Sequence, residues 1–343
     1  DASGTAQIET EVSPDRQARA VSIERLVVTD ATLIYDAEGS DLVSYGNVDL
    51  SLDWPDRLGP ARITAKLTPA DNPVVVTADI DGFAGFITGD IQTLRALVET
   101  TSGSIDFDGR ANTAGGVAGR LALKTTNTGA FFGALGVPGV DLPPKLGRSI
   151  DLQTDLTLTP DRQLALRDLV VDLAGNRLIG AADIGLNGVP QINAQLDAGA
   201  LDLTSATGGS ADGGTSGGSN AGGGGWPKTP IDASGLAAFN GDIALNAQSI
   251  DLGSFKLGQT QTVLRNNNSR MVFELARLAA YGGLTTGEFV INNRKGLSVG
   301  GQLDIASIQM QPLLRDAIDL NRLTGQGDMQ LSFLGAGRSV DAI

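Results

Sequence analysis

The segment NVDLSLDW (residues 47–54) alternates between apolar and polar side chains at every position after its first residue. Successive side chains of an extended strand point to opposite faces, so Val48, Leu50, Leu52 and Trp54 share one face. The two aspartates and the serine between them lie on the other face. This pattern predicts a β-strand with one buried face and one solvated face.

The same alternation recurs along most of the chain. Leu152, Leu156 and Leu158 share one face of a second segment, and Ile243 and Leu245 share one face of a third. We count roughly fifteen such segments, most of them short and separated by turn residues, as in antiparallel sheets. A mainly β fold is therefore expected. The clearest further segments are 62–68, 76–82, 104–109, 192–203, 297–306 and 327–333.

Helical signals are few and short. The segment 90–99 begins with an aspartate suited to an N-cap and has apolar residues at helical spacing. The segments 129–136 and 311–318 are the other candidates, the latter with a proline near its start. We expect three small helices that cover part of a sheet.

A hairpin is expected around the sequence MVFELARLAAYGGLTTGEFVIN, which starts at Met271. Gly282 and Gly283 would supply the backbone angles of a tight turn between two strands. Tyr281 would then lie at the rim of the sheet. An amphipathic residue at a sheet edge explains this tyrosine better than a binding site does.

The segment 207–225 is rich in glycine and has no apolar residue larger than alanine. Such a segment cannot bury enough surface to offset its chain entropy, so we predict a flexible linker or disordered insert. It divides the chain into an N-terminal β segment, residues 1–206, and a C-terminal β segment, residues 226–343.

Composition excludes several functions. The chain of 343 residues has no histidine and no cysteine, which removes the commonest metal ligand and the usual general base. Its net charge of −14 argues against a nucleic-acid partner, because binding phosphates requires a positive patch. We expect no cofactor and no metal.

Catalysis has little support in the sequence. The carboxylate pairs Asp106 with Asp108 and Asp151 with Asp155 could suit glycoside hydrolysis, but both lie on predicted solvated faces. The glycine-rich segment 111–119 does not spell a phosphate-binding loop and is expected to be a turn. We predict that the protein is not an enzyme.

No apolar run approaches the ~20 residues of a transmembrane helix, and no signal peptide is visible. The chain begins at Asp1 without an initiator methionine and stops just after a strand-like segment. We expect it to be a fragment, with a targeting or anchoring segment outside it.

Four segments of the chain carry a resemblance to a known family through their residues and their order. They are SIERLVVTDATLIYDAEG (22–39), GWPKTPIDASGL (225–236), LARLAAYGGLTTGEFVINN (275–293) and QPLLRDAIDLNRLTGQGDMQLSFLGAGRS (311–339). In this order they resemble the AsmA family of bacterial envelope proteins, and the third segment resembles a hairpin of the family's C-terminal region. Ala233, where a leucine is expected, and the long glycine-rich insert depart from the family pattern.

The resemblance implies a long, curled antiparallel sheet whose inner face is an apolar groove for phospholipid acyl chains. It also implies a location in the periplasm of a Gram-negative bacterium, tethered to the inner membrane by a segment outside this sequence. The implied role is phospholipid delivery to the outer membrane, with outer-membrane assembly proteins as further partners. Combined with the alternation, it predicts that the groove is lined by Val48, Leu50, Leu52, Leu152, Leu156, Leu158, Ile243 and Leu245.

Two alternatives remain at this point, and a third is disfavoured. A two-sheet sandwich that packs its own core would show the same alternation. A non-enzymatic scaffold that supports outer-membrane protein assembly would share the fold but carry no lipid. An outer-membrane barrel is disfavoured, because three tyrosines and two tryptophans cannot build the aromatic girdles that such a barrel needs.

Overall fold

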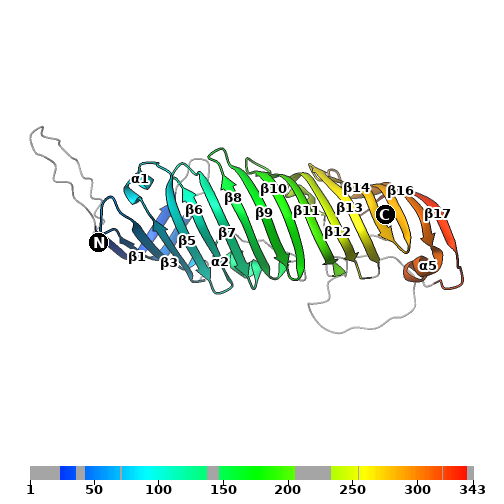
Figure 1. Cartoon of the computed structure of the whole chain (residues 1–343), viewed down its shortest axis with the longest axis horizontal. Coiled ribbons are helices and arrows are strands. Elements are labelled where there is room, and N and C mark those ends of the chain that lie inside the picture. The colour runs from blue at the N-terminus through cyan, green and yellow to red at the C-terminus, as the bar shows by residue number, and fades with distance from the viewer. Residues whose placement is uncertain are drawn as a thin grey trace, which may run out of the picture.

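A computed structural model describes residues 24–35, 43–69, 72–136, 147–204, 233–253, 255–318 and 320–337. The described chain forms one elongated sheet of seventeen strands (Figure 1). The mainly β fold is therefore confirmed. The strands are β1 Arg25–Tyr35, β2 Val43–Asp53, β3 Ala61–Leu67, β4 Val74–Ile80, β5 Gln92–Thr100, β6 Gly103–Ala111, β7 Val117–Thr125, β8 Ile150–Leu158, β9 Gln163–Leu173, β10 Asn176–Gly185, β11 Gln191–Asp202, β12 Asn240–Asp251, β13 Lys256–Asn267, β14 Arg270–Ala280, β15 Gly283–Asn292, β16 Ser298–Gln309 and β17 Gln326–Ala336.

The strands follow one another across the sheet in chain order, and each is hydrogen-bonded to the next. The colours of Figure 1 therefore run in sequence from one end of the molecule to the other. Within the described residues no strand pairing joins β1 to β17, so the sheet stays open.

One neighbouring pair is parallel, namely β11 with β12. Parallel neighbours need a crossover connection, since the chain must return to the starting end of the previous strand. The connection between Asp202 and Asn240 contains the predicted linker, residues 207–225, which lies outside the described residues. The sheet itself is continuous across this point, because β11 and β12 pair over almost their whole length.

The helices are short and lie at the rims of the sheet. Helix α1, Phe83–Ile87, lies at one rim, and α2, Thr128–Ala134, and α5, Met310–Ile318, lie at the opposite rim (Figure 1). A 3-10 turn, η2, covers Ser234–Ala237. None of the described helices has the length and apolar character needed to cross a membrane.

The helices expected at 129–136 and 311–318 are confirmed, but the helix expected at 90–99 is wrong. That segment forms strand β5, in which Leu94, Ala96 and Val98 face inward. Pairing with β4 and β6 on both sides overrides the helical spacing of its apolar residues. The nearby helix α1 forms instead from the residues just before it.

The β14–β15 hairpin is confirmed, with one change at its turn. Left-handed backbone angles occur at Tyr281, φ 48°, and Gly282, φ 75°, as in a type I′ turn. Gly283 does not share this role. It is the first residue of β15, where an added Cβ would lie 2.5 Å from the carbonyl oxygen of Ala306, so close approach of the neighbouring strand requires a glycine there.

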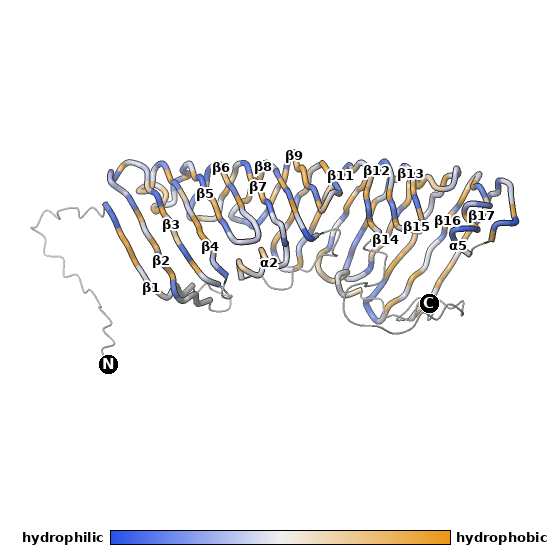
Figure 2. Tube along the Cα trace, turned by 90° about the horizontal axis from the view of Figure 1, so that it is seen from below, coloured by the Kyte–Doolittle hydropathy of each residue, from blue (hydrophilic) through white to orange (hydrophobic). Residues whose placement is uncertain are grey.

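The sheet curls about its long axis (Figure 2). Bulges, which bend a strand locally, interrupt the pairings β1–β2, β8–β9, β9–β10, β13–β14, β14–β15 and β16–β17. In β9 the inward residues are Leu164 and Leu166 and then Leu169, with Asp168 at φ 48° between them. In a regular strand, residues three apart point to opposite faces. The extra residue of the bulge returns the following apolar side chains to the inward face. β14 and β16 show the same step at Leu275–Leu278 and Ile305–Ile308.

Candidate binding groove

One row of side chains crosses all seventeen strands on the same face of the sheet. Each residue of this row lies directly opposite the row's residue on the neighbouring strand. Fifteen of these residues are Ala, Val, Leu, Ile or Met, two are threonine, and none is charged. The row, called the central row below, consists of Val28, Leu50, Ala65, Val76, Val98, Ile105, Leu123, Leu152, Val171, Leu178, Ala198, Ala247, Thr260, Leu278, Thr285, Ile305 and Met329.

All eight residues predicted to line the groove lie on the face of the central row. Leu50 and Leu152 belong to the row itself. Leu156 and Ile243 share a parallel row, which runs from Leu156 through Leu166, Ala182 and Ala194 to Ile243. Val48, Leu52, Leu158 and Leu245 lie beside these rows on their own strands, Val48 with only 5% of its surface exposed.

Buried threonines on this face use their hydroxyl groups internally. The Thr154 hydroxyl donates to the carbonyl of Arg167 at 2.8 Å, and the Thr262 hydroxyl donates to the carbonyl of Glu274 at 3.0 Å. Both bonds lie at bulges, where a carbonyl loses its ladder partner. Each hydroxyl is therefore bonded to the backbone, so these two buried threonines leave no unpaired hydroxyl donor on this face.

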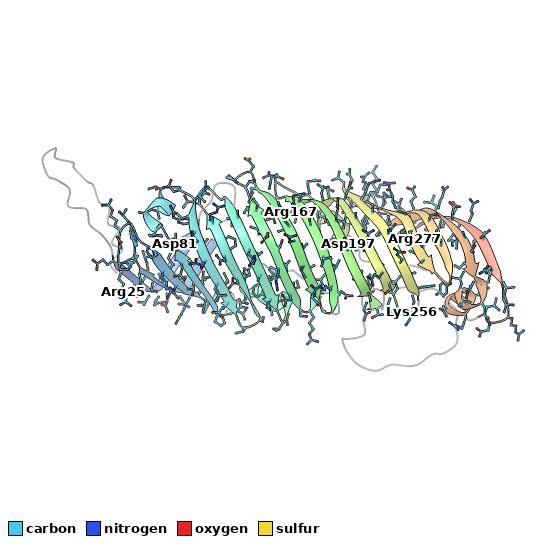
Figure 3. The ribbon with its side chains drawn as sticks, viewed as in Figure 1. Arg25, Asp81, Arg167, Asp197, Lys256 and Arg277 are labelled. Carbon is cyan, nitrogen blue, oxygen red and sulfur yellow. The ribbon has the colours of Figure 1, made fainter. Side chains whose placement is uncertain are left out.

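The opposite face is polar and carries an ordered series of charges. Arg25, Asp53, Arg62, Asp79, Arg95, Asp108, Arg120, Asp155, Arg167 and Asp183 follow one another from β1 to β10, and basic and acidic residues alternate strand by strand. We call this series the charge ladder; Figure 3 labels its members Arg25 and Arg167. Ion pairs within it include Arg62–Asp79 at 2.7 Å and Arg167–Asp183 at 2.6 Å. A hydrogen bond from Arg62 lowers the pKa of Asp79.

No second sheet packs on the apolar face in the part of the chain that the structure describes, and extensive contacts between strands occur only between hydrogen-bonded neighbours. Helix α2 packs on this face at one rim, where the ring of Phe131 is fully buried beside Gly103. The two-sheet sandwich is therefore not the observed fold. Apolar side chains on this face are nonetheless mostly half-buried, because the sheet curls around them (Figure 2). We call this concave surface the apolar groove.

The apolar groove contains a pair of stacked aromatic rings that the sequence patterns did not predict. Phe273 and Phe289 are direct neighbours across β14 and β15, and their rings stack at 4.2 Å between centroids. Phe289 lies over Gly301, where an added Cβ would come within 2.8 Å of the Cβ of Phe289. The aromatic pair and the glycine beyond it are visible in the sequence, but their contact depends on strand register.

The carboxylate pairs considered for catalysis lie on the polar face, as expected. Asp108 and Asp155 belong to the charge ladder and face Arg95 and Arg120. Among the described residues, no cluster of three or more Asp, Glu, His or Cys side chains could hold a metal ion. One surface hollow of about 750 Å³ is lined mainly by polar residues, among them the ion-paired Asp242, Arg265 and Glu274.

A comparison with models of protein families matches residues 172–343 to the model described as the AsmA family. The match starts at the end of β9 and includes every strand from β10 to β17, which is about half of the chain. Strands β1 to β8 lie before the match and continue the same sheet. A comparison with curated proteins found no match, and neither did a comparison with solved structures.

Proposed function

This chain belongs to the AsmA family, and from that premise we propose that it is a lipid-binding conduit of the bacterial envelope. The apolar groove would hold phospholipid acyl chains and let them pass along the sheet. The observation that carries this proposal is the central row, which runs across all seventeen strands without a charged side chain. Family membership is consistent with a lipid-transport or envelope-related role.

The chemistry of the apolar groove suits an acyl chain. Each buried methylene of a lipid is stabilised by about 0.8 kcal/mol when it leaves water, so a long apolar surface can retain a chain without any polar contact. Seventeen strands spaced by ~4.8 Å extend over roughly 75 Å. An acyl chain spans about half of a hydrocarbon core that is ~30 Å thick, so several chains fit in series.

We also propose where the protein acts, how it is attached and what it delivers. The protein acts in the periplasm, is tethered to the inner membrane by a segment outside this sequence, and delivers phospholipid to the outer membrane. It does so without catalysis, and outer-membrane assembly proteins are further partners. The alternative is a scaffold that supports outer-membrane protein assembly through protein contacts and carries no lipid.

A pair of variants on adjacent residues of β8 tests the conduit. Leu156 faces the apolar groove and Thr157 is exposed on the polar face. Leu156→Asp places a carboxylate against the acyl chains, whereas Thr157→Asp adds the same charge where water solvates it. Bound phospholipid is measured by lipid extraction and native mass spectrometry, and folding by thermal unfolding.

The conduit predicts that the wild-type protein and Thr157→Asp carry phospholipid, and that Leu156→Asp carries several-fold less while it stays folded. Folding survives because water can reach the new carboxylate in an open groove that holds no lipid. A wild-type protein that is purified without lipid from cells, and that takes up none from vesicles, would contradict the conduit and favour the scaffold.

A further inference from the structure

Two connections at one rim of the sheet form an apolar tip near its N-terminal end. The β2–β3 turn, residues 54–60, and the β4–β5 connection, residues 81–91, lie side by side, because Ala61 pairs with Ile80 across β3 and β4. The rings of Trp54 and Phe83 join them in an edge-to-face contact with 5.0 Å between centroids. Figure 1 shows α1 at this rim, and Figure 3 labels Asp81, where the second connection begins.

Three large aliphatic side chains project from this tip into solvent. The exposed fractions are 84% for Leu58, 64% for Ile91 and 55% for Ile87. Leu58 is held in place, since its backbone N–H donates to the Asp56 carboxylate at 3.0 Å. Helix α1, which carries Ile87, is closed by a bond from the Thr88 hydroxyl to the carbonyl of Gly85 at 2.9 Å. The exposure of these side chains is therefore built into ordered turns.

The tip is continuous with the apolar groove. Trp54 follows Leu52 by two residues at the end of β2, so the alternation places its side chain on the groove face. Below the tip, Ala61 and Ile80 are each only 2% exposed. The Trp54 indole N–H is buried and has no hydrogen-bond partner among the described residues. An apolar path thus leads from the exposed side chains into the groove.

The charges around the tip indicate which surface it fits. The two connections contain Asp56, Asp81 and Asp90 but only one basic residue, Arg57. This balance disfavours anionic partners such as nucleic acid or a strongly acidic membrane. Single aliphatic side chains on turns, backed by a tryptophan and a phenylalanine, suit insertion into the interface of a zwitterionic bilayer.

We propose that this tip inserts into a phospholipid bilayer surface and is the port through which acyl chains pass between the bilayer and the apolar groove. The port rests on the proposed function, but bilayer binding by the tip can be measured separately from lipid carried in the groove. The inserted side chains would be Leu58, Ile87 and Ile91, and Trp54 would lie at the boundary between bilayer and groove.

Vesicle flotation tests the tip. The full chain is mixed with phosphatidylcholine vesicles, and the bound fraction is compared for the wild-type protein and the double variant Leu58→Asp/Ile91→Asp. Both side chains are exposed, so the variant should fold normally. The control Leu186→Asp/Val189→Asp makes the same kind of change at two exposed residues of the β10–β11 turn, which lies at the same rim but several strands away from the tip.

The proposal predicts that the wild-type protein and the control float with the vesicles, and that binding by the tip variant falls at least about tenfold. Adding phosphatidylglycerol should weaken binding by the wild-type protein, because the tip is acidic. A tip variant that floats as well as the wild-type protein, or a wild-type protein that does not float, would overturn the proposal.

Two further measurements separate the tip from the conduit. Leu156→Asp should lose carried lipid yet float normally, so a failed conduit and a failed tip give different results. In a Trp226→Phe background, Trp54 is the single tryptophan of the chain. The Leu156→Asp change is added to this background, so that lipid carried in the groove does not contribute to the signal. Brominated phosphatidylcholine in the vesicles should then quench the fluorescence of Trp54. Absence of quenching would place the bilayer contact elsewhere and refute the port.

Discussion

Tyr281 joins the β14–β15 turn to helix α5. Its hydroxyl donates to an Asp316 carboxylate oxygen at 3.0 Å, and Asp316 also accepts a bond from the Arg315 guanidinium at 2.9 Å. Burial, followed by the bond to Asp316, raises the pKa of Tyr281 to about 12. A non-glycine residue in a left-handed turn conformation costs roughly 1 kcal/mol, and this contact offsets part of that cost.

Spectrophotometric titration tests this role of Tyr281. One of the three tyrosines should ionise near pH 12, and Tyr281→Phe should remove that late step, whereas Tyr35→Phe should retain it. The folded-state pKa lies above the unfolded value of ~10, so the stabilisation is complete below pH 10 and is lost as the pH rises toward 12. If all tyrosines ionised together near pH 10, the bond to Asp316 would be absent.

At the scale of elements, the charge ladder specifies strand register. An apolar face fixes which side of a strand points inward, but it does not by itself fix how far a strand slides along its neighbour. Arg95 lies directly between Asp79 and Asp108, and a slip of two residues would break both contacts while the apolar face stayed inward. Each exposed pair contributes little alone, so the effect depends on repetition from β1 to β10.

Reversing one charge of the ladder should therefore destabilise the sheet. Arg95→Asp places three aspartates side by side on β4, β5 and β6, and should lower the free energy of unfolding by about 1–2 kcal/mol. Arg110→Asp, on an exposed residue outside the ladder, is the matched control and should cost less. Urea unfolding measures both, and 0.5 M salt should shrink the difference. Equal losses for the two variants would argue against a role in register.

Element type followed from the sequence wherever the alternation was regular, as in β2 and β8. The expected helix at 90–99 failed because its apolar spacing fits both structures, and only the neighbouring strands favour β5. The bulges had a local signal, an apolar step of three such as Leu275 to Leu278 within a strand. The charge ladder and the Phe273–Phe289 stack had none, since both depend on register between strands.

At the scale of the whole molecule, the fold forms one continuous apolar surface, although the family model matches only residues 172–343. The family match begins near β10, yet the central row extends unbroken from β1 to β17. The parallel pair β11–β12 keeps this surface intact across the long connection, because Ala198 pairs directly with Ala247. A conduit needs this continuity more than it needs any single residue.

The central claim is that lipid occupies the apolar groove along its whole length, and photo-crosslinking from lipid-loaded protein tests it most directly. Benzoylphenylalanine replaces one residue at a time at three groove positions and at the neighbouring positions on the polar face. The groove positions, all in the central row, are Leu50, Leu152 and Ile305, and the controls are Ser51, Gln153 and Asp304.

We predict phospholipid adducts from all three groove positions, on strands near both ends and in the middle of the sheet, and few or none from the controls. Adducts from a single groove position would contradict a continuous conduit. Equal labelling of both faces, or no adduct at any position, would contradict lipid binding in the groove altogether.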